Sequence, residues 1–199
     1  MQLHVLSDGK KQVDELVNIL SSIHPNVDYM HIREKQKTAS ELVTIVQQLL
    51  AQGVPAEKII INDRLDVAHA MKLKGAQLAF HSVNIQLARK AFPHLTLGCS
   101  VHSLEEALYA QQNGADYLLF GHIFETTSKQ NKKPRGLAQL EEIVRHVSIP
   151  VIAIGGIKPE NVKEVHNIGA SGIAIMSGIL DAQDVVKATK TYQTSKLVR

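Results

Sequence analysis

Two cations close one apolar run of this sequence and are the first candidates for chemistry. Arg33 and Lys35 share the alternation of Tyr29 and His31 in the run Tyr29–Arg33. Residues two apart in an extended strand point to the same side, so both cations should face one pocket. Burying two cations without an anion is costly. We expect Arg33 and Lys35 to bind a carboxylate or a phosphate; the alternative is a salt bridge with Asp or Glu at the rim.

A histidine ends another apolar run. His122 closes Tyr117–His122 and shares the alternation of Leu118 and Phe120. An imidazole with a pKa of about 6.5 can take up and release a proton near neutrality. Position alone does not assign catalysis to His122, because a lone histidine is more often structural or simply exposed.

Three further histidines raise the question of a metal site. His31, His81 and His102 also lie near the ends of apolar runs, as does Asp63. Their positions do not follow a compact ligand spacing, and transition-metal sites usually do. We therefore expect no metal ligands in this chain.

Glycines follow the last two apolar runs. Gly155, Gly156 and Ile157 come after one run, and Ser177 and Gly178 follow Met176 after the next. Glycine lets the backbone approach an oxyanion closely, and helix N-termini favour negative charge. We expect phosphate to bind at Gly155, Gly156, Met176, Ser177 and Gly178. The alternative is that these glycines only form tight turns.

Eight short apolar runs must position these residues. They alternate with stretches of helical period, such as Val13, Leu16, Val17 and Leu20. Gly53 precedes Val54-Pro55, Gly75 and Gly114 follow helical patterns, and Pro159 suits the first turn of a helix. The runs are Leu3–Ser7, Tyr29–Arg33, Lys58–Asn62, Gln77–Phe80, Thr96–Val101, Tyr117–His122, Pro150–Gly155 and Gly172–Met176.

This pattern predicts an α/β protein in which a single (β/α)8 TIM barrel occupies residues 1–199. Several runs are apolar on both faces, as parallel strands covered by helices are. A doubly wound open sheet is the alternative, but eight evenly spaced units favour closure of the barrel. The segment Phe124–Gly136 is long and polar for so small a barrel and follows the sixth run. We expect a functional loop there, such as a lid, rather than a surface excursion.

Composition restricts the partners. The formal net charge is +3, and the dense basic cluster is Lys129, Lys132, Lys133 and Arg135. The chain has no Trp and few other aromatics, so nucleic-acid binding through this cluster is a weak alternative. No apolar run is long enough for a signal peptide or a membrane span. Cys99 is the single cysteine, so we expect a cytoplasmic protein without membrane or nucleic-acid partners.

Six motifs, in their order and spacing, resemble the thiamin phosphate synthase superfamily over nearly the whole chain. This resemblance implies a TIM barrel, and it implies a coupling of a pyrimidine diphosphate to a thiazole phosphate with Mg²⁺ held by two aspartates. The motifs are Tyr29–Lys35, Ile61–Arg64, Ser100–Ala107, Gly114–Tyr117, Thr126–Lys129 and Ala153–Ile157.

The departures from the synthase pattern concern the diphosphate half of the pocket. Asp63 matches the first aspartate, but His81–Val83 stand where the second should fall. His31 replaces a glutamine of the family, and Gly121-His122 replaces a Gly-Pro. One carboxylate fewer weakens a Mg²⁺–diphosphate site, because Mg²⁺ prefers anionic oxygen ligands.

These departures are similar to the thiazole tautomerase (TenI) branch of the superfamily. The resemblance implies an isomerase of thiamine biosynthesis that aromatises a thiazole phosphate carboxylate by moving a proton from ring carbon C2 to the exocyclic alkene carbon. It implies His122 as the acid/base and no cofactor. We expect Lys35 to be catalytic as well, because Lys35, like His122 and the substrate's own carboxylate, is a candidate to take the C2 proton. The implied substrate-binding residues are Arg33, Ser100, Thr126, Ser128 and Lys129.

Two alternatives stay open. One is a thiamin phosphate synthase with an altered magnesium site, and the other is a non-catalytic regulator that binds thiazole phosphate. The sequence does not set the oligomeric state; a homodimer is compatible with it, since small barrels often pair.

Overall fold

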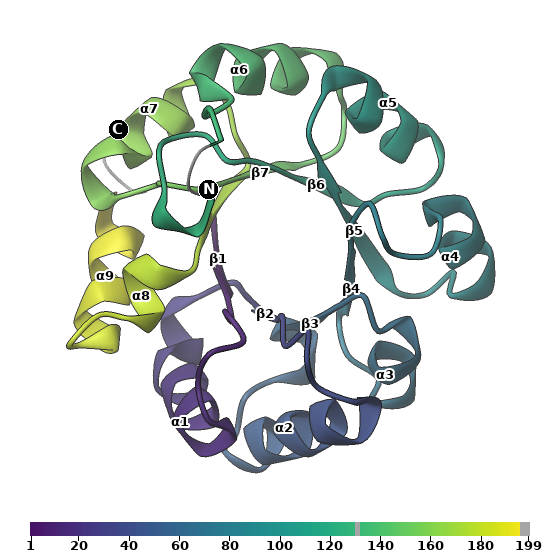
Figure 1. Cartoon of the computed structure of the whole chain (residues 1–199), viewed down its shortest axis with the longest axis vertical. Coiled ribbons are helices and arrows are strands. Elements are labelled where there is room, and N and C mark those ends of the chain that lie inside the picture. Colours follow the sequence, from purple (N-terminus) through teal and green to yellow (C-terminus); the bar gives the residue numbers. More distant parts are fainter. Residues whose placement is uncertain (130–131, 196–199) are drawn as a thin grey trace.

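The structure, a computed structural model, describes residues 1–129 and 132–195. Figure 1 shows a ring of strands surrounded by helices. The strands pair in parallel and in sequence order, and β1 pairs with β8, so the sheet closes. The predicted (β/α)8 barrel is confirmed, and the open sheet is excluded. The strands are β1 Gln2–Leu6, β2 Tyr29–Ile32, β3 Ile59–Asn62, β4 Gly75–Leu78, β5 Thr96–Val101, β6 Tyr117–Gly121, β7 Val151–Ile154 and β8 Gly172–Ile175.

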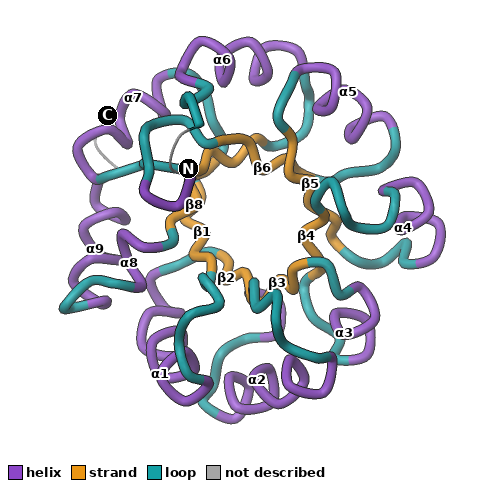
Figure 2. The backbone as a smooth tube through the Cα atoms, in the orientation of Figure 1, coloured by secondary structure: helices purple, strands orange, loops and turns teal. Residues whose placement is uncertain are grey.

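The helices form the outer layer in Figure 2. In the described part of the chain, no helix is long and apolar enough to cross a membrane. The helices are α1 Val13–Ile23, α2 Ala39–Ala51, α3 Leu65–Ala70, α4 Ile85–Ala91, α5 Leu104–Gln112, α6 Gly136–His146, α7 Val162–Asn167, α8 Ser177–Leu180 and α9 Val185–Ser195. Short 3₁₀ turns occur at His24–Asn26, Ala56–Lys58, Thr127–Lys129 and Pro159–Asn161.

Alternation along the strands separates two apolar layers. One set of side chains, such as Met30 and Phe120, packs between the barrel and the helices. The other set fills the barrel interior, where Ile60, Leu119 and Ile152 are in contact. Each such side chain contributes about 1.5–3 kcal/mol when fully buried, so the two layers fix the strand register.

The barrel interior also contains a polar layer. His4 and His31 are fully buried, and His4 Nδ1 lies 2.9 Å from His31 Nε2. Gln77 and Tyr117 approach each other beside Gly98, where a Cβ atom would lie 2.1 Å from the Tyr117 ring. Burial, and then the neighbouring His4, hold the pKa of His31 well below its usual range. His31 is therefore neutral and structural near neutral pH.

Two boundary predictions are corrected. Gly75 does not end a helix but begins β4, because its missing side chain lets β5 approach: a Cβ atom there would lie 1.8 Å from the Thr96 carbonyl oxygen. β4 ends at Leu78. Phe80, which was predicted to be the last residue of this strand, therefore lies on the following loop and is 91% exposed.

Candidate active site

A large cavity opens at the carboxyl ends of the strands. Its volume is about 1540 Å³, whereas pockets for one small ligand usually measure ~300–1,000 Å³. The cavity therefore has room for more than one small molecule. Every strand end contributes lining residues, among them Leu6, Arg33, Asn62, Gln77, Ser100, Gly121, Ile154 and Ala174.

The cationic side of the cavity follows β2. Arg33, Lys35 and Lys37 all line it, and no ion pair of these three occurs among the described residues. The salt-bridge alternative for Arg33 and Lys35 is therefore not observed. The backbone of this segment is fixed, because the Arg33 N–H donates to Ser7 Oγ at 2.7 Å. Lys37 was not predicted, although it continues the spacing of two residues that indicated Arg33 and Lys35.

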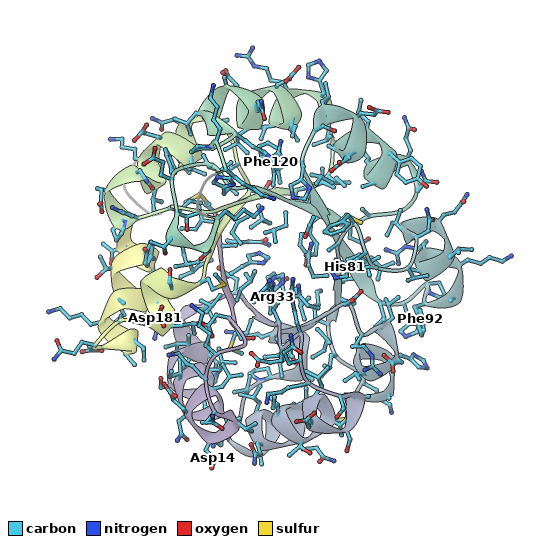
Figure 3. The ribbon with its side chains drawn as sticks, viewed as in Figure 1. Asp14, Arg33, His81, Phe92, Phe120 and Asp181 are labelled. Carbon is cyan, nitrogen blue, oxygen red and sulfur yellow. The ribbon has the colours of Figure 1, made fainter. Side chains whose placement is uncertain are left out.

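An acidic residue follows β3 on the same side. Asp63 has a positive φ of 69°, and its N–H donates to the Gln77 carbonyl at 2.9 Å. Its Oδ2 lies 3.5 Å from His81 Nε2. Figure 3 labels Arg33 and His81 beside the central opening of the barrel. The neighbouring Arg64 pairs with Asp66, so part of its charge is already balanced.

The glycine side of the cavity follows β7. Gly155 and Gly156 have positive φ values of 98° and 67°. A Cβ atom on Gly155 would lie 2.2 Å from His122 Cβ, and one on Gly156 would lie 2.3 Å from the Glu125 carbonyl oxygen. Both glycines are thus required by the close passage of the segment after β6, whether or not they also contact phosphate.

The turn after β8 completes this side. Met176 precedes α8, and the N–H groups of Ser177 and Gly178 in its first turn have no intrahelical partner. Tyr192 on α9 supports both turns: its hydroxyl donates to the Ile157 carbonyl at 3.2 Å and fills the space where a Gly178 Cβ would lie. Lys158, which the sequence interpretation did not select, adds a cation to the lining.

His122 lies at the cavity wall, but not for the predicted reason. Leu118 and Phe120 pack against the helices, whereas His122 lines the cavity. The alternation does not extend to His122 because β6 ends at Gly121. His122 is 5% exposed, and its Nε2 lies 3.1 Å from the Lys132 carbonyl oxygen.

The loop from residue 124 to residue 136 borders the cavity as expected of a functional loop. Its residues 130–131 lie outside the described part of the chain. Thr126, Ser128 and Lys129 line the cavity. The pKa of Lys129 is lowered by burial and then by Lys132, Arg135 and Arg33, so the loop's cations lie within electrostatic reach of the cationic side.

The base of this loop is held by hydrogen bonds to backbone carbonyls: the Arg135 N–H donates to His122 at 2.9 Å, and Arg135 Nη1 donates to His102 at 2.5 Å. On β5, Ser100 Oγ accepts from Gln77 Nε2 at 3.1 Å. The predicted site residues thus surround one cavity, and their roles stay predictions.

Two sides of the cavity could attract anions. In the closed order of the strands, only β1 lies between β8 and β2. Arg33, Lys35 and Lys37 follow β2, next to β3, while the glycine turns follow β7 and β8. This arrangement is typical of a class of protein: (β/α)8 barrels that bind anionic small molecules at their strand ends.

Comparisons with known proteins give the family. The family model described as thiamine monophosphate synthase matches residues 3–179, and the chain belongs to this family. It is 38% identical over 192 residues to the thiamine-phosphate synthase of Pyrococcus abyssi, covering 96% of this chain and 92% of that one. It is 40% identical over 163 residues to that of Chloroflexus aurantiacus, covering 79% and 74%.

A solved structure agrees. The thiamine phosphate pyrophosphorylase from Pyrococcus furiosus superposes with a TM-score of 0.82 at 35% identity, covering 98% of this chain and 95% of that one. The 3-hexulose-6-phosphate synthases, at 16% and 13% identity, share the fold alone.

These relatives correct the function expected from the sequence. They are named thiamine-phosphate synthases, which are transferases, so the interpretation as a thiazole tautomerase, an isomerase, is wrong. The absence of one aspartate does not by itself imply the loss of the diphosphate chemistry. The cavity retains Arg33, Lys35 and Lys37, and such cations can balance phosphate charge without a second carboxylate.

The family resemblance implies Mg²⁺ held by two aspartates. Asp63 faces an imidazole rather than a second carboxylate. Among the described residues, no group of three or more His, Cys, Asp or Glu side chains could hold a metal ion. Glu34, another carboxylate of the cavity lining, accepts a hydrogen bond from the Gly9 N–H at 3.2 Å. Mg²⁺ prefers hard anionic oxygen ligands, so these residues do not fit the two-carboxylate magnesium site that the resemblance implies.

Proposed function

We propose that this chain is a thiamine-phosphate synthase, which joins a pyrimidine diphosphate to a thiazole phosphate. The thiazole ring nitrogen attacks the methylene carbon of the pyrimidine, and a new C–N bond forms. The C–O bond to the diphosphate breaks, and the diphosphate leaves with the electron pair. No oxidant or reductant is consumed.

The observation that carries this proposal is the pair of anion-attracting sides in one cavity. A coupling of two phosphorylated substrates needs a place for each anion and a gap in which the reacting atoms meet. The glycine turns after β7 and β8 suit the thiazole phosphate, while Arg33 and Lys35 suit the diphosphate. The volume of about 1540 Å³ accommodates both. The naming of the relatives supports the same reaction.

Positioning is the main contribution of this chain to the chemistry. Holding two reactants in line converts a bimolecular step into an effectively unimolecular one, and this can contribute about 7–11 kcal/mol to the barrier reduction. Arg33 and Lys35 would stabilise the charge that develops on the leaving diphosphate. The loop that carries Thr126, Ser128 and Lys129 would exclude water from the reacting carbon, which otherwise hydrolyses.

The test is a coupling assay with the purified full chain. Pyrimidine diphosphate and thiazole phosphate are mixed with the protein in excess Mg²⁺, and thiamine phosphate and inorganic pyrophosphate are quantified. The proposal expects both products in equal amounts at a rate proportional to protein concentration. If the folded chain binds thiazole phosphate but forms neither product, the chain is not a synthase.

A further inference from the structure

The diphosphate side of the cavity differs from a magnesium-dependent site in the sign of its charge. Asp63 is the carboxylate that follows β3 at the cavity, and His81 Nε2 is 3.5 Å from its Oδ2. Arg33, Lys35 and Lys37 line the same region. These three cations outnumber the two carboxylates of this region, Asp63 and Glu34, and Glu34 already accepts a hydrogen bond from the Gly9 N–H. The excess of positive charge attracts an anion directly, whereas two carboxylates without such an excess need a metal between them and the phosphates.

We propose that Arg33, Lys35 and Lys37 bind a diphosphate anion directly, so that this site does not require a divalent metal. The inference rests on the proposed function, because it assigns the leaving diphosphate to this side. It adds the recognition chemistry: Arg33 offers paired guanidinium donors to phosphate oxygens, and the two lysines supply point charges.

The geometry supports a site prepared before the anion arrives. The β2 segment is tied to the segment after β1 by two hydrogen bonds, from the Arg33 N–H to Ser7 Oγ and from the Gly9 N–H to Glu34 Oε1. None of the three cations forms an ion pair among the described residues. Binding an anion therefore breaks no existing salt bridge, which lowers the cost of association.

His81 has a defined part in this arrangement. Its ring lies against Asp63 and stacks edge-on with Phe80, with ring centroids 5.0 Å apart. The imidazole thus occupies the side of Asp63 where a second carboxylate could share a metal ion. Asp63 is left as a partner for His81 rather than as one half of a metal site.

The experiment measures the binding of inorganic pyrophosphate by titration calorimetry to the full chain, at one pH and ionic strength, in EDTA and in Mg²⁺. We expect the dissociation constant in EDTA to lie within about threefold of that in Mg²⁺, because charge-assisted hydrogen bonds supply the affinity. Binding that appears only with Mg²⁺ would overturn the inference while leaving the coupling activity unaffected.

Variants locate the site. Lys35→Gln should weaken pyrophosphate binding by ~10-fold, the typical effect of losing one hydrogen bond to a charged group. Lys90→Gln removes the same charge from the exposed face of α4 and should change binding less than twofold. Equal weakening in both variants, or a larger loss in Ser177→Ala than in Lys35→Gln, would contradict a diphosphate site after β2.

The variant His81→Asp tests the role of the imidazole. A second carboxylate beside Asp63 repels the anion, so the dissociation constant for pyrophosphate in EDTA should rise by ~10-fold or more. Mg²⁺ should restore the affinity. Unchanged binding of pyrophosphate in EDTA would show that position 81 does not decide the metal requirement. Because these readouts need no turnover, they can succeed or fail independently of the coupling assay.

Discussion

The two sides of the cavity attract anions by different means. The side after β7 and β8 uses glycine turns whose backbone is fixed by close packing. The side after β2 and β3 uses long charged side chains that the described residues leave without ion pairs. Substitutions on the first side should therefore disturb the fold together with binding, whereas substitutions on the second should change binding alone.

The largest effect is expected from Gly155→Ala. The new Cβ would lie 2.2 Å from His122 Cβ at a φ of 98°. Overpacking and a left-handed non-glycine residue together should lower the free energy of unfolding by about 3 kcal/mol or more. Urea denaturation measures this change.

The matched control is Gly136→Ala, which has a similar φ of 77° but no neighbouring atom within 4 Å of the new Cβ. Only the backbone strain remains, so the loss should be about 1 kcal/mol. Equal losses in the two variants would mean that the close contact with His122 does not constrain the glycine side.

Arg33→Gln tests the charged side. Losing one preorganised cation at the leaving group should lower kcat/KM for coupling ~10²-fold, or about 2.7 kcal/mol. The melting temperature should stay close to that of the unaltered chain, because the Arg33 side chain has no ion pair among the described residues. A large loss of stability would place Arg33 in the framework of the barrel and erase the contrast between the two sides.

The barrel interior beneath the cavity should make stability depend on pH. The pKa of His31 is lowered well below its usual range by burial and then by His4. Above about pH 6.5, His31 is neutral in both the folded and the unfolded chain, and its contribution is constant. Below this pH only the unfolded chain gains the proton, so the free energy of unfolding should fall by about 1.4 kcal/mol per pH unit.

Denaturation midpoints at pH 7.5 and 5.5 measure this dependence, and His31→Gln should flatten it. An undiminished slope in the variant would assign the dependence to other histidines with lowered pKa values, such as His24 and His102.

The smallest effect is expected from Tyr192→Phe, which tests how the two glycine turns are joined. The change removes the hydrogen bond to the Ile157 carbonyl and should cost about 1 kcal/mol of stability. The KM for thiazole phosphate should rise a few-fold while the affinity for pyrophosphate stays the same. A change confined to pyrophosphate would contradict the placement of Tyr192 behind the glycine side.

The barrel could be predicted from the sequence because its signals are local. Eight short apolar runs alternate with stretches of helical period, and their number and even spacing favour a closed barrel over a doubly wound open sheet. The strand limits were less accurate where tertiary packing decides them. Gly75 follows a helical pattern, yet the close approach of Thr96 places it in a strand; only the neighbouring strand reveals that constraint.

The candidate site was predicted in outline. Arg33 and Lys35 follow from alternation along one strand, and the glycines follow from their positions after the last two runs. Lys158 and Tyr192 were missed. Tyr192 could not be found from the local pattern, because it comes to the cavity from α9, far along the chain. The contact of His81 with Asp63 joins two loops, so the sequence showed a missing aspartate but not what the histidine does there.

A crystal structure with thiamine phosphate and inorganic pyrophosphate bound together would test the central claim most directly. The account predicts the phosphate monoester at Gly156 and Ser177 and the pyrophosphate beside Arg33 and Lys35, with the new C–N bond between them. Both anions on the same side of the cavity, or pyrophosphate in contact with neither cation, would contradict it.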